Sequence, residues 1–171
     1  VQSRTQIMAL KTAVPQIERI KAYDLHEEAS QKFVNWVSKT LNLEAQVVNS
    51  PKNTVEGTDI IVTATTADEP IVKEEWLKKG SFFAHVGSYQ EEEEEVILKC
   101  DKVVVDHWHE VLHRKTPLLA KLYFRGKIDD SRIYANMGEI ILGKKKGRED
   151  KEERIFFSPL GLGSEDVAVA N

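Results

Sequence analysis

The fold is decided by residues 1–24, which read VQSRTQIMALKTAVPQIERIKAYD. The first part, Gln2–Ala13, has apolar residues at helical spacing, and Pro15 ends that helix. Residues 19–24 then form a strand pattern that stops on Asp24. A helix that leads into a strand ending in Asp or Glu is the second half of a dinucleotide-binding βαβ unit, with the acid placed to hold ribose hydroxyls. Because no strand and no glycine-rich turn precede Val1, we expect the sequence to open in the middle of this motif.

Beyond Asp24 the sequence alternates between helical and strand patterns. Ile60, Ile61 and Val62 follow one another without alternation, which indicates a strand covered on both faces. The expected elements are helix 27–41, strand 45–48, helical turn 53–56, strand 59–64, helix 73–79, strand 81–86, helix 91–99, strand 102–106, a helical stretch 108–125 interrupted by Pro117, helix 131–142, strand 154–158 and a helix that opens after residues 161–163. This rhythm predicts an α/β protein with a Rossmann-type, doubly wound parallel sheet.

The composition excludes several classes of protein. The 171 residues carry a formal net charge of -4 with acids and bases interleaved, so no basic stripe is present for nucleic acid or an anionic membrane. No apolar run approaches the roughly 20 residues of a membrane span. Cys100 is the only cysteine, which excludes an internal disulfide and favours a cytoplasmic location. We expect Cys100 to be buried rather than reactive.

Three strand ends carry residues that suit a dinucleotide, whose place in such a fold is outside the carboxyl ends of the strands. The carboxylate of Asp24 favours two ribose hydroxyls over a 2'-phosphate, which predicts NAD rather than NADP. Residues 63–66, Thr-Ala-Thr-Thr, offer small side chains and hydroxyl donors, and Gly87 in residues 86–89 allows the backbone to approach a nicotinamide ring. An Asp after a strand more often caps a helix or serves a turn than binds a ligand, so the hypothesis rests on the recurrence of suitable residues at three strand ends.

Other charged motifs receive plainer interpretations. His109, Glu110 and His113 match the H-E-x-x-H zinc motif, but such a short match arises often by chance and Pro117 truncates the helix, so we expect packing roles and no metal site. The glutamates of residues 91–95 suit the first turn of a helix, whose dipole favours acids there. The basic run at residues 144–148 is interpreted as a solvated loop rather than a phosphate site.

The whole sequence resembles the ornithine cyclodeaminase and mu-crystallin family. The matching segments, in order, are VQSRTQ (1–6), GTDIIVTATT (57–66), EP (69–70), KG (79–80), VG (86–87), VVD (104–106), GE (138–139), GR (147–148) and GLGSEDVA (161–168). The family is NAD(P)-dependent, and in it a glycine-rich turn precedes a Val-Gln or Ala-Gln pair. The resemblance therefore implies an NAD-binding part, with a separate substrate and dimerisation domain outside this sequence and a homodimer for the full-length protein.

The resemblance also implies roles for particular residues. The cofactor-binding residues that match the family are Val1 and Gln2 on the pyrophosphate side, Asp24 at the ribose, Thr65 along the cofactor, and Val86, Gly87 and Ser88 in the nicotinamide loop. The sequence departs from the family at Tyr89, where the cyclodeaminases have a catalytic aspartate. A tyrosine, with an ordinary pKa near ~10, is a poor base at neutral pH, so the catalytic residue stays unassigned.

A branch of the family fits this departure. Residues 101–108 (DKVVVDHW), 147–150 (GRED) and 158–162 (SPLGL) resemble dehydrogenases that make 2,3-diaminopropionate by oxidising an amino-acid conjugate of glutamate. We therefore expect an NAD-dependent oxidoreductase that takes a hydride from a carbon bearing nitrogen and hydrolyses the resulting imine. The alternatives are ornithine cyclodeaminase, which converts L-ornithine to L-proline and ammonia, then a non-catalytic NAD(P)-binding crystallin-like protein or a zinc hydrolase.

The expected organisation places a Rossmann NAD-binding domain at residues 1–142. Residues 143–171 would add a loop, a strand and a helix that return toward the preceding substrate domain. In the usual strand order the missing first strand lies between the strands at 19–24 and 59–64. We therefore expect the isolated chain to expose two strand edges, and neither to fold stably nor to bind NAD.

Overall fold

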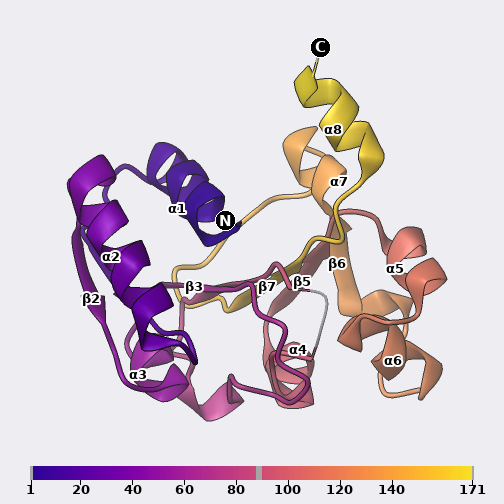
Figure 1. Cartoon of the computed structure of the whole chain (residues 1–171). Helices are drawn as coiled ribbons and strands as arrows, with labels where there is room; N and C mark the ends of the chain where they lie inside the picture. Colours follow the sequence, from indigo (N-terminus) through magenta and orange to yellow (C-terminus); the bar gives the residue numbers. More distant parts are fainter. Residues whose placement is uncertain (1, 88–89, 171) are drawn as a thin grey trace. The chain divides into compact units, whose positions relative to one another are not determined.

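The computed structural model describes residues 2–87 and 90–170, and it divides the chain into two compact units, residues 1–56 and 57–171 (Figure 1). The expected site residues Val1, Ser88 and Tyr89 lie outside the described residues. Each unit is α/β in character, and the secondary-structure order follows the alternation expected from the sequence.

Unit 1 is a helix-covered pair of parallel strands. Its elements are α1 Gln2–Ala13, β1 Arg19–Ala22, α2 Glu27–Leu41, β2 Glu44–Val47 and α3 Pro51–Val55. Strand β1 pairs with β2 in parallel, with Arg19 opposite Glu44, and α2 packs against both strands (Figure 1). The core of the unit is built around Ile7, Val37 and Leu43. The apolar residues Ile7 of α1 and Val37 of α2 are therefore buried as their helical spacing predicts, whereas Met8 of α1 is exposed.

Unit 2 contains a five-stranded parallel sheet. Its strands are β3 Ile60–Thr63, β4 Phe82–His85, β5 Lys102–Val105, β6 Ile133–Asn136 and β7 Ile155–Ser158, in the spatial order β3-β4-β7-β5-β6. Its helices are α4 Glu94–Lys99, α5 Trp108–Arg114, α6 Leu118–Phe124, α7 Met137–Ile141 and α8 Gly163–Ala170, with 3-10 turns at Glu74–Trp76 and Asp130–Arg132. The order of the strands confirms the expected doubly wound type of sheet.

The core of unit 2 lies on both faces of the sheet. All four residues of β5 are buried, as expected for a central parallel strand. Phe83 on β4 packs edge to face against Phe156 on β7, with their ring centroids 5.4 Å apart, a favoured aromatic geometry. Cys100 is a free, buried thiol, and burial raises its pKa to about 11, which confirms the prediction of a buried cysteine.

The expected helix at residues 131–142 is wrong. Residues Ile133–Asn136 form the edge strand β6 instead, because pairing with β5 buries Ala135, and the helix α7 begins only at Met137. Asn136 and Glu139 form a capping box that fixes this start. Local helical pattern is therefore overridden by tertiary strand pairing in this segment.

Two other expected helices are shorter than predicted. The stretch at 73–79 contains only the 3-10 turn Glu74–Trp76, since Leu77 is already extended. The helix expected from residue 91 begins at Glu94, so Glu91 and Glu92 lie before it and are buried rather than exposed in a first turn. By contrast, the expected break at Pro117 is confirmed, because Pro117 directly precedes α6 and separates it from α5.

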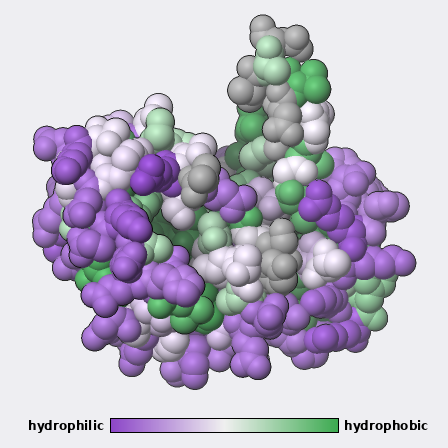
Figure 2. Space-filling view, viewed as in Figure 1, coloured by the Kyte–Doolittle hydropathy of each residue, from purple (hydrophilic) through white to green (hydrophobic). Residues whose placement is uncertain are grey.

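Each sheet has an edge strand, and part of the surface is apolar. Among the described residues, β1 has only β2 as a strand partner and β3 has only β4. Large apolar side chains are exposed at Ile141, Leu142 and Val167, and Figure 2 shows hydrophobic residues along α8. Strand β7 comes from the segment 143–171 and lies between β4 and β5; the expected return of this segment toward a preceding domain stays a prediction. No helix within the described ranges has the length and apolar character needed to traverse a bilayer.

Candidate functional site

The carboxyl ends of β3 and β4 are joined by a buried carboxylate. The backbone N–H of Thr65, just beyond β3, donates a hydrogen bond to Oε1 of Glu91. The other oxygen, Oε2, lies against Gly87, just beyond β4, so closely that a Cβ atom at Gly87 would collide with it. A Cβ atom at Gly87 would therefore force the Glu91 carboxylate to shift. The close neighbour of Gly87 in this structure is thus a side chain of the protein itself, and the approach to a nicotinamide ring stays a prediction.

The backbone around Glu91 is fixed by the segment at residues 71–72, which forms an isolated parallel bridge with it. The N–H groups of Ile71 and Val72 donate to the carbonyl oxygen of Glu91 at 2.9 and 3.0 Å, and the N–H of Glu93 donates to the carbonyl of Val72 at 3.0 Å. Nearby, the N–H of Val86 donates to the carbonyl of Thr63 at 2.9 Å, which continues the pairing of β4 with β3. Glu91 is thus held on a rigid backbone rather than on a free loop.

His85, the last residue of β4, links two buried glutamates. Its Nδ1 lies 2.5 Å from Oε2 of Glu92, and its Nε2 lies 3.8 Å from Oε2 of Glu91. The side chains of His85, Glu91 and Glu92 are 6%, 0% and 1% exposed. Ionisable groups are rarely buried to this degree unless they are paired. We call these residues the His85 cluster.

The ionisation of this cluster is shifted by burial and by charge. Burial lowers the pKa of His85, but the hydrogen bond and charge of Glu92, with the charge of Glu91, outweigh it and raise the pKa above its ordinary value. Burial raises the pKa of Glu92, against the opposing effect of His85. Both shifts favour retention of a proton by the coupled pair of His85 and Glu92.

One atom of the cluster lacks a hydrogen bond. Oε2 of Glu91 is buried and has no hydrogen-bond partner within the described part of the chain, since the Nε2 of His85 is too distant at 3.8 Å. A buried acceptor left unpaired costs about 1–3 kcal/mol. This atom lies between the loops that contain Thr65 and Gly87, both of which are predicted to contact the ligand. The unpaired acceptor therefore lies within the candidate site.

The other strand ends are also tied to neighbouring loops by polar side chains. Asp106, which follows β5, accepts the backbone N–H groups of Leu160 and Gly161 beyond β7. Asn136, at the end of β6, accepts the N–H of Trp108 at 2.7 Å. The carboxyl edge of unit 2 is therefore a row of polar contacts that orders the loops a ligand would meet.

The remaining described site residues belong to unit 1. Gln2 is the exposed first residue of α1. Asp24 is exposed two residues after β1, and its Oδ1 accepts the backbone N–H of His26 at 2.9 Å. Asp24 therefore does serve the turn that leads into α2, the second role that the sequence left open, and a carboxylate has further acceptor capacity for a ligand hydroxyl.

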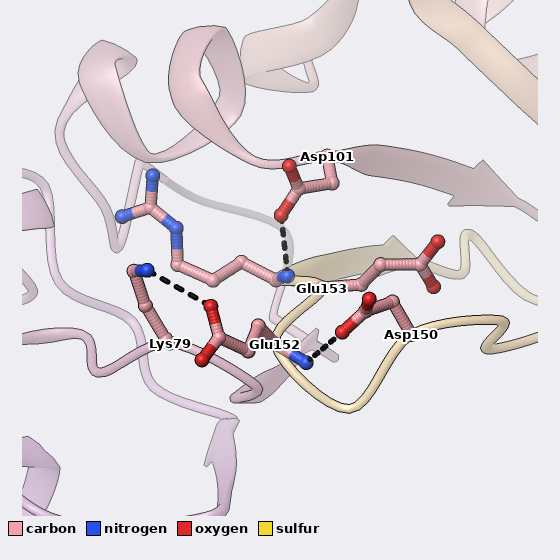
Figure 3. Close-up of a pocket in the computed structure, with 6 residues that line it drawn as sticks. Lys79, Asp101, Asp150, Glu152 and Glu153 are labelled. Carbon is pink, nitrogen blue, oxygen red and sulfur yellow. Dashed lines mark hydrogen bonds and ion pairs between the residues drawn. The ribbon is translucent and has the colours of Figure 1, made fainter.

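A hollow of about 540 Å³ lies at the opposite, amino-terminal edge of the sheet in unit 2 (Figure 3). Its lining is charged and comprises Lys79, Asp101, Asp150, Glu152, Glu153 and Arg154. These groups satisfy one another: Lys79 pairs with Glu152 at 2.9 Å, and Asp101 accepts the backbone N–H of Arg154 at 2.6 Å (Figure 3). Because this edge is remote from the carboxyl ends of the strands, we interpret the hollow as a structural ion-pair network.

The H-E-x-x-H motif lies on α5, with His109 and Glu110 exposed. Over residues 2–87 and 90–170, no three side chains of the His, Cys, Asp and Glu types come together as a metal site. The basic residues 144–148 are exposed, in agreement with the solvated-loop interpretation. These two motifs therefore add nothing to the candidate site.

Sequence reasoning found Thr65, Val86 and Gly87, and the structure brings these three residues together. It missed His85, Glu91 and Glu92, because a run of glutamates is ordinarily a solvated surface. The available signal was the position of His85 at the end of the apolar strand Phe82–His85, where a histidine needs a polar partner.

A parallel sheet with its polar contacts at the carboxyl edge defines the Rossmann-type class of α/β proteins. Comparison with known sequences is consistent with this class. The sequence model of the ornithine cyclodeaminase/mu-crystallin family matches residues 1–171. The chain belongs to this family.

Individual relatives span the same region. An N-((2S)-2-amino-2-carboxyethyl)-L-glutamate dehydrogenase of Staphylococcus aureus is 31% identical over 166 residues, which cover 96% of this chain and 49% of that protein. The structure of Thermococcus litoralis Delta(1)-pyrroline-2-carboxylate reductase with NADH and L-proline is 35% identical with a TM-score of 0.89, over 99% of this chain and 53% of that one. An archaeal alanine dehydrogenase dimer with bound NAD is 33% identical with a TM-score of 0.86, over 99% and 52%. The chain spans about half the length of the curated relatives it matches.

Proposed function

We propose that this chain is the cofactor-binding part of an NAD-dependent oxidoreductase that acts on an amino acid or an amino-acid conjugate. The observation that carries the proposal is the contact of Glu91 with both Thr65 and Gly87 at the carboxyl edge of the sheet. The relatives of the chain include a dehydrogenase of an amino-acid conjugate and a reductase of a cyclic imine. Similarity to both kinds of relative supports chemistry at a carbon–nitrogen bond.

The described residues suit a dinucleotide. Asp24 supplies an exposed carboxylate after β1 for ribose hydroxyls, and a negative charge there disfavours a 2'-phosphate. Gln2 at the start of α1, with the preceding Val1, would face the pyrophosphate. In unit 2, Thr65 would line the cofactor, and Val86, Gly87 and Ser88 would lie along its nicotinamide ring. The bound nicotinamide would accept a hydride from the substrate.

The contribution of the chain to the reaction is positioning. Oxidation removes a hydride from carbon and a proton from the attached nitrogen, and a carbon–nitrogen double bond forms in the substrate. Water then adds to that bond, which splits into a carbonyl compound and an amine. Rigid loops at the ends of β3 and β4 would fix the distance and angle between the cofactor and the reacting carbon. These loops would also limit the access of water before the hydride is transferred.

The finer parts of the proposal concern the whole protein. We propose that its substrate is an amino-acid conjugate of glutamate, supported by the similarity to the Staphylococcus aureus dehydrogenase. We propose that it acts as a homodimer, as in the archaeal alanine dehydrogenase. A cytoplasmic location is supported by Cys100, a free buried thiol.

The test is an assay of the complete gene product that follows NADH absorbance. N-(2-amino-2-carboxyethyl)glutamate, alanine, proline and ornithine are supplied with NAD, and pyrroline-2-carboxylate is supplied with NADH. We expect NADH to form with the glutamate conjugate. Release of proline and ammonia from ornithine without net NADH would instead establish a cyclodeaminase. NAD binding with no turnover of any substrate would favour the crystallin-like alternative, and stoichiometric zinc in the purified protein would favour a hydrolase.

A further inference from the structure

The His85 cluster touches both loops of the proposed nicotinamide site. Glu91 accepts the N–H of Thr65 through one oxygen and packs against Gly87 through the other. His85 lies behind Glu91, and Glu92 lies on the far side of His85. A single carboxylate therefore connects the end of β3 with the end of β4, and its Oε2 lies 3.8 Å from Nε2 of His85.

Among the described residues, Glu91 and Glu92 are the charged groups that act on His85. In register, His85 lies opposite Thr63 of β3, and its ring meets the ring of Phe156 on β7, with centroids 6.2 Å apart. Neither neighbour titrates near neutral pH. The charge of His85 therefore decides whether two carboxylates can remain buried close together.

We propose that Glu91 is a positioning residue for the nicotinamide cofactor: it holds the Thr65 and Gly87 loops in their binding arrangement, and protonated His85, braced by Glu92, holds Glu91 in place. This inference rests on the proposed function, because it takes these loops as the nicotinamide site. Loss of the His85 proton leaves two carboxylates beside a neutral ring. Their repulsion and the cost of burying them displace Glu91, and the loops lose their shared anchor.

The consequence is linkage between protonation and NAD binding. If the binding arrangement of the Thr65 and Gly87 loops requires protonated His85, NAD binds more weakly as the pH rises through the ionisation of His85, and binding above that pH takes up a proton. The change in Kd is about tenfold for each pKa unit by which binding raises the pKa of His85. A purely structural role for the cluster would alter stability without proton uptake on binding.

The experiment measures NAD binding to the complete gene product by calorimetry from about pH 6 to about pH 9, the range in which histidines titrate. Buffers of different ionisation enthalpy report the proton uptake. Glu91→Gln keeps an oxygen for the Thr65 N–H but removes the charge, and His85→Gln removes the titrating ring. Glu95→Gln is the matched control, because Glu95 belongs to the same glutamate run and is exposed.

We expect the Kd of the wild-type protein and of Glu95→Gln to rise together by about tenfold across this range, with proton uptake. For Glu91→Gln and His85→Gln we expect weaker binding at low pH and no pH dependence. In the protein without cofactor, the amide of Thr65 should lose hydrogen-exchange protection over the same pH interval.

The outcomes separate this inference from the proposed function. NAD binding that does not vary with pH and is unchanged in Glu91→Gln contradicts the inference and leaves the function intact. Absence of NAD binding to the wild-type protein at every pH contradicts the function and the cofactor role of Glu91 with it. If a variant unfolds, the pH profile of wild-type binding and the exchange of the Thr65 amide still decide the question.

Discussion

Asp106 accepts the backbone N–H of Gly161 through Oδ2 at 2.8 Å, and so connects the chain leaving β5 with the chain leaving β7. The same oxygen accepts the N–H of Leu160 at 2.7 Å, and Oδ1 accepts the N–H of His107 at 2.8 Å. Three N–H donors thus share one buried carboxylate between neighbouring strands. This arrangement fixes the direction in which the chain departs toward α8.

Replacement of Asp106 by asparagine should destabilise the protein. An asparagine has one acceptor oxygen and an NH2 group, so at least one backbone N–H would face another donor. We expect a loss of about 1–3 kcal/mol in the free energy of unfolding of the complete gene product, measured by urea denaturation. The exposed Asp68→Asn is the control and should change the free energy by less than about 0.5 kcal/mol. An Asp106→Asn protein as stable as wild type would contradict this account.

Gly80 is required for two separate reasons. Its φ of 76° lies in the left-handed region, and a Cβ atom there would collide with the carbonyl oxygen of Lys151. Gly126 has a similar φ of 69° but open space around the Cβ position, so Gly126→Ala measures the conformational cost alone, about 1–2 kcal/mol. We expect Gly80→Ala to cost about 1–3 kcal/mol beyond this control in the same denaturation assay. Equal losses for the two variants would show that the backbone near Lys151 gives way.

The stability of the protein should fall as the pH rises above neutral. The pKa of His85 is raised in the folded state by its glutamate partners, and the raised pKa of Glu92 acts in the same direction. The folded state therefore binds protons more tightly than the unfolded chain. The contribution of His85 is fully present below the ordinary histidine pKa of about 6.5 and is lost as the pH rises through the raised pKa.

The measurement for this prediction is the denaturation midpoint as a function of pH. The wild-type midpoint should decrease from about pH 6 to about pH 9, and His85→Asn should lack this component. His109→Asn replaces an exposed histidine and should follow the wild-type profile. A wild-type midpoint that rises over this interval would have the wrong sign for the proposed pairing.

Asp24 should set the preference between the two nicotinamide dinucleotides. Asp24→Ser retains an oxygen for the His26 N–H turn but removes the charge that disfavours a 2'-phosphate. We expect the ratio of the NADP Kd to the NAD Kd to fall about tenfold or more, equivalent to about 1.4 kcal/mol. Glu27→Gln, an exposed carboxylate at the start of α2, should leave the ratio unchanged. Tighter binding of NADP than of NAD by the wild-type protein would refute the role given to Asp24.

Much of the fold could be predicted because its signals are local. The apolar run Ile60, Ile61 and Val62 predicts a strand, and Pro117 predicts a break between helices; both features are present. Cover on both faces of that strand is only partial, because Ile61 is buried whereas Ile60 and Val62 are half-buried. The strand Ile133–Asn136 could not be found in this way, because its conformation comes from pairing with β5, which is distant in sequence. The spacing of apolar residues indicates which face of a helix or strand is buried, whereas the pairing partner of a strand depends on the fold of the whole chain.

Part of the candidate site could likewise be predicted from local sequence, and part could not. Gly87 could be singled out because a glycine after a strand permits a close approach, and a neighbouring group does lie close to it in the structure. The group that makes it is Glu91, which the sequence places in a plain acidic run. The burial of Glu91 and Glu92 depends on His85 from another segment, and no local pattern carries that information.

The sequence by itself determined the family, the alternation of strands and helices, and the strand ends at which a ligand belongs, because these follow from residue type and spacing along the chain. Only the tertiary structure decided that β7 lies between β4 and β5, that residues 133–136 pair as a strand, and that two glutamates of the run 91–95 are buried on a histidine. Those features depend on hydrogen bonds and on the desolvation of side chains between segments that are far apart in sequence. These interactions contribute free energy only when the fold brings the segments into contact.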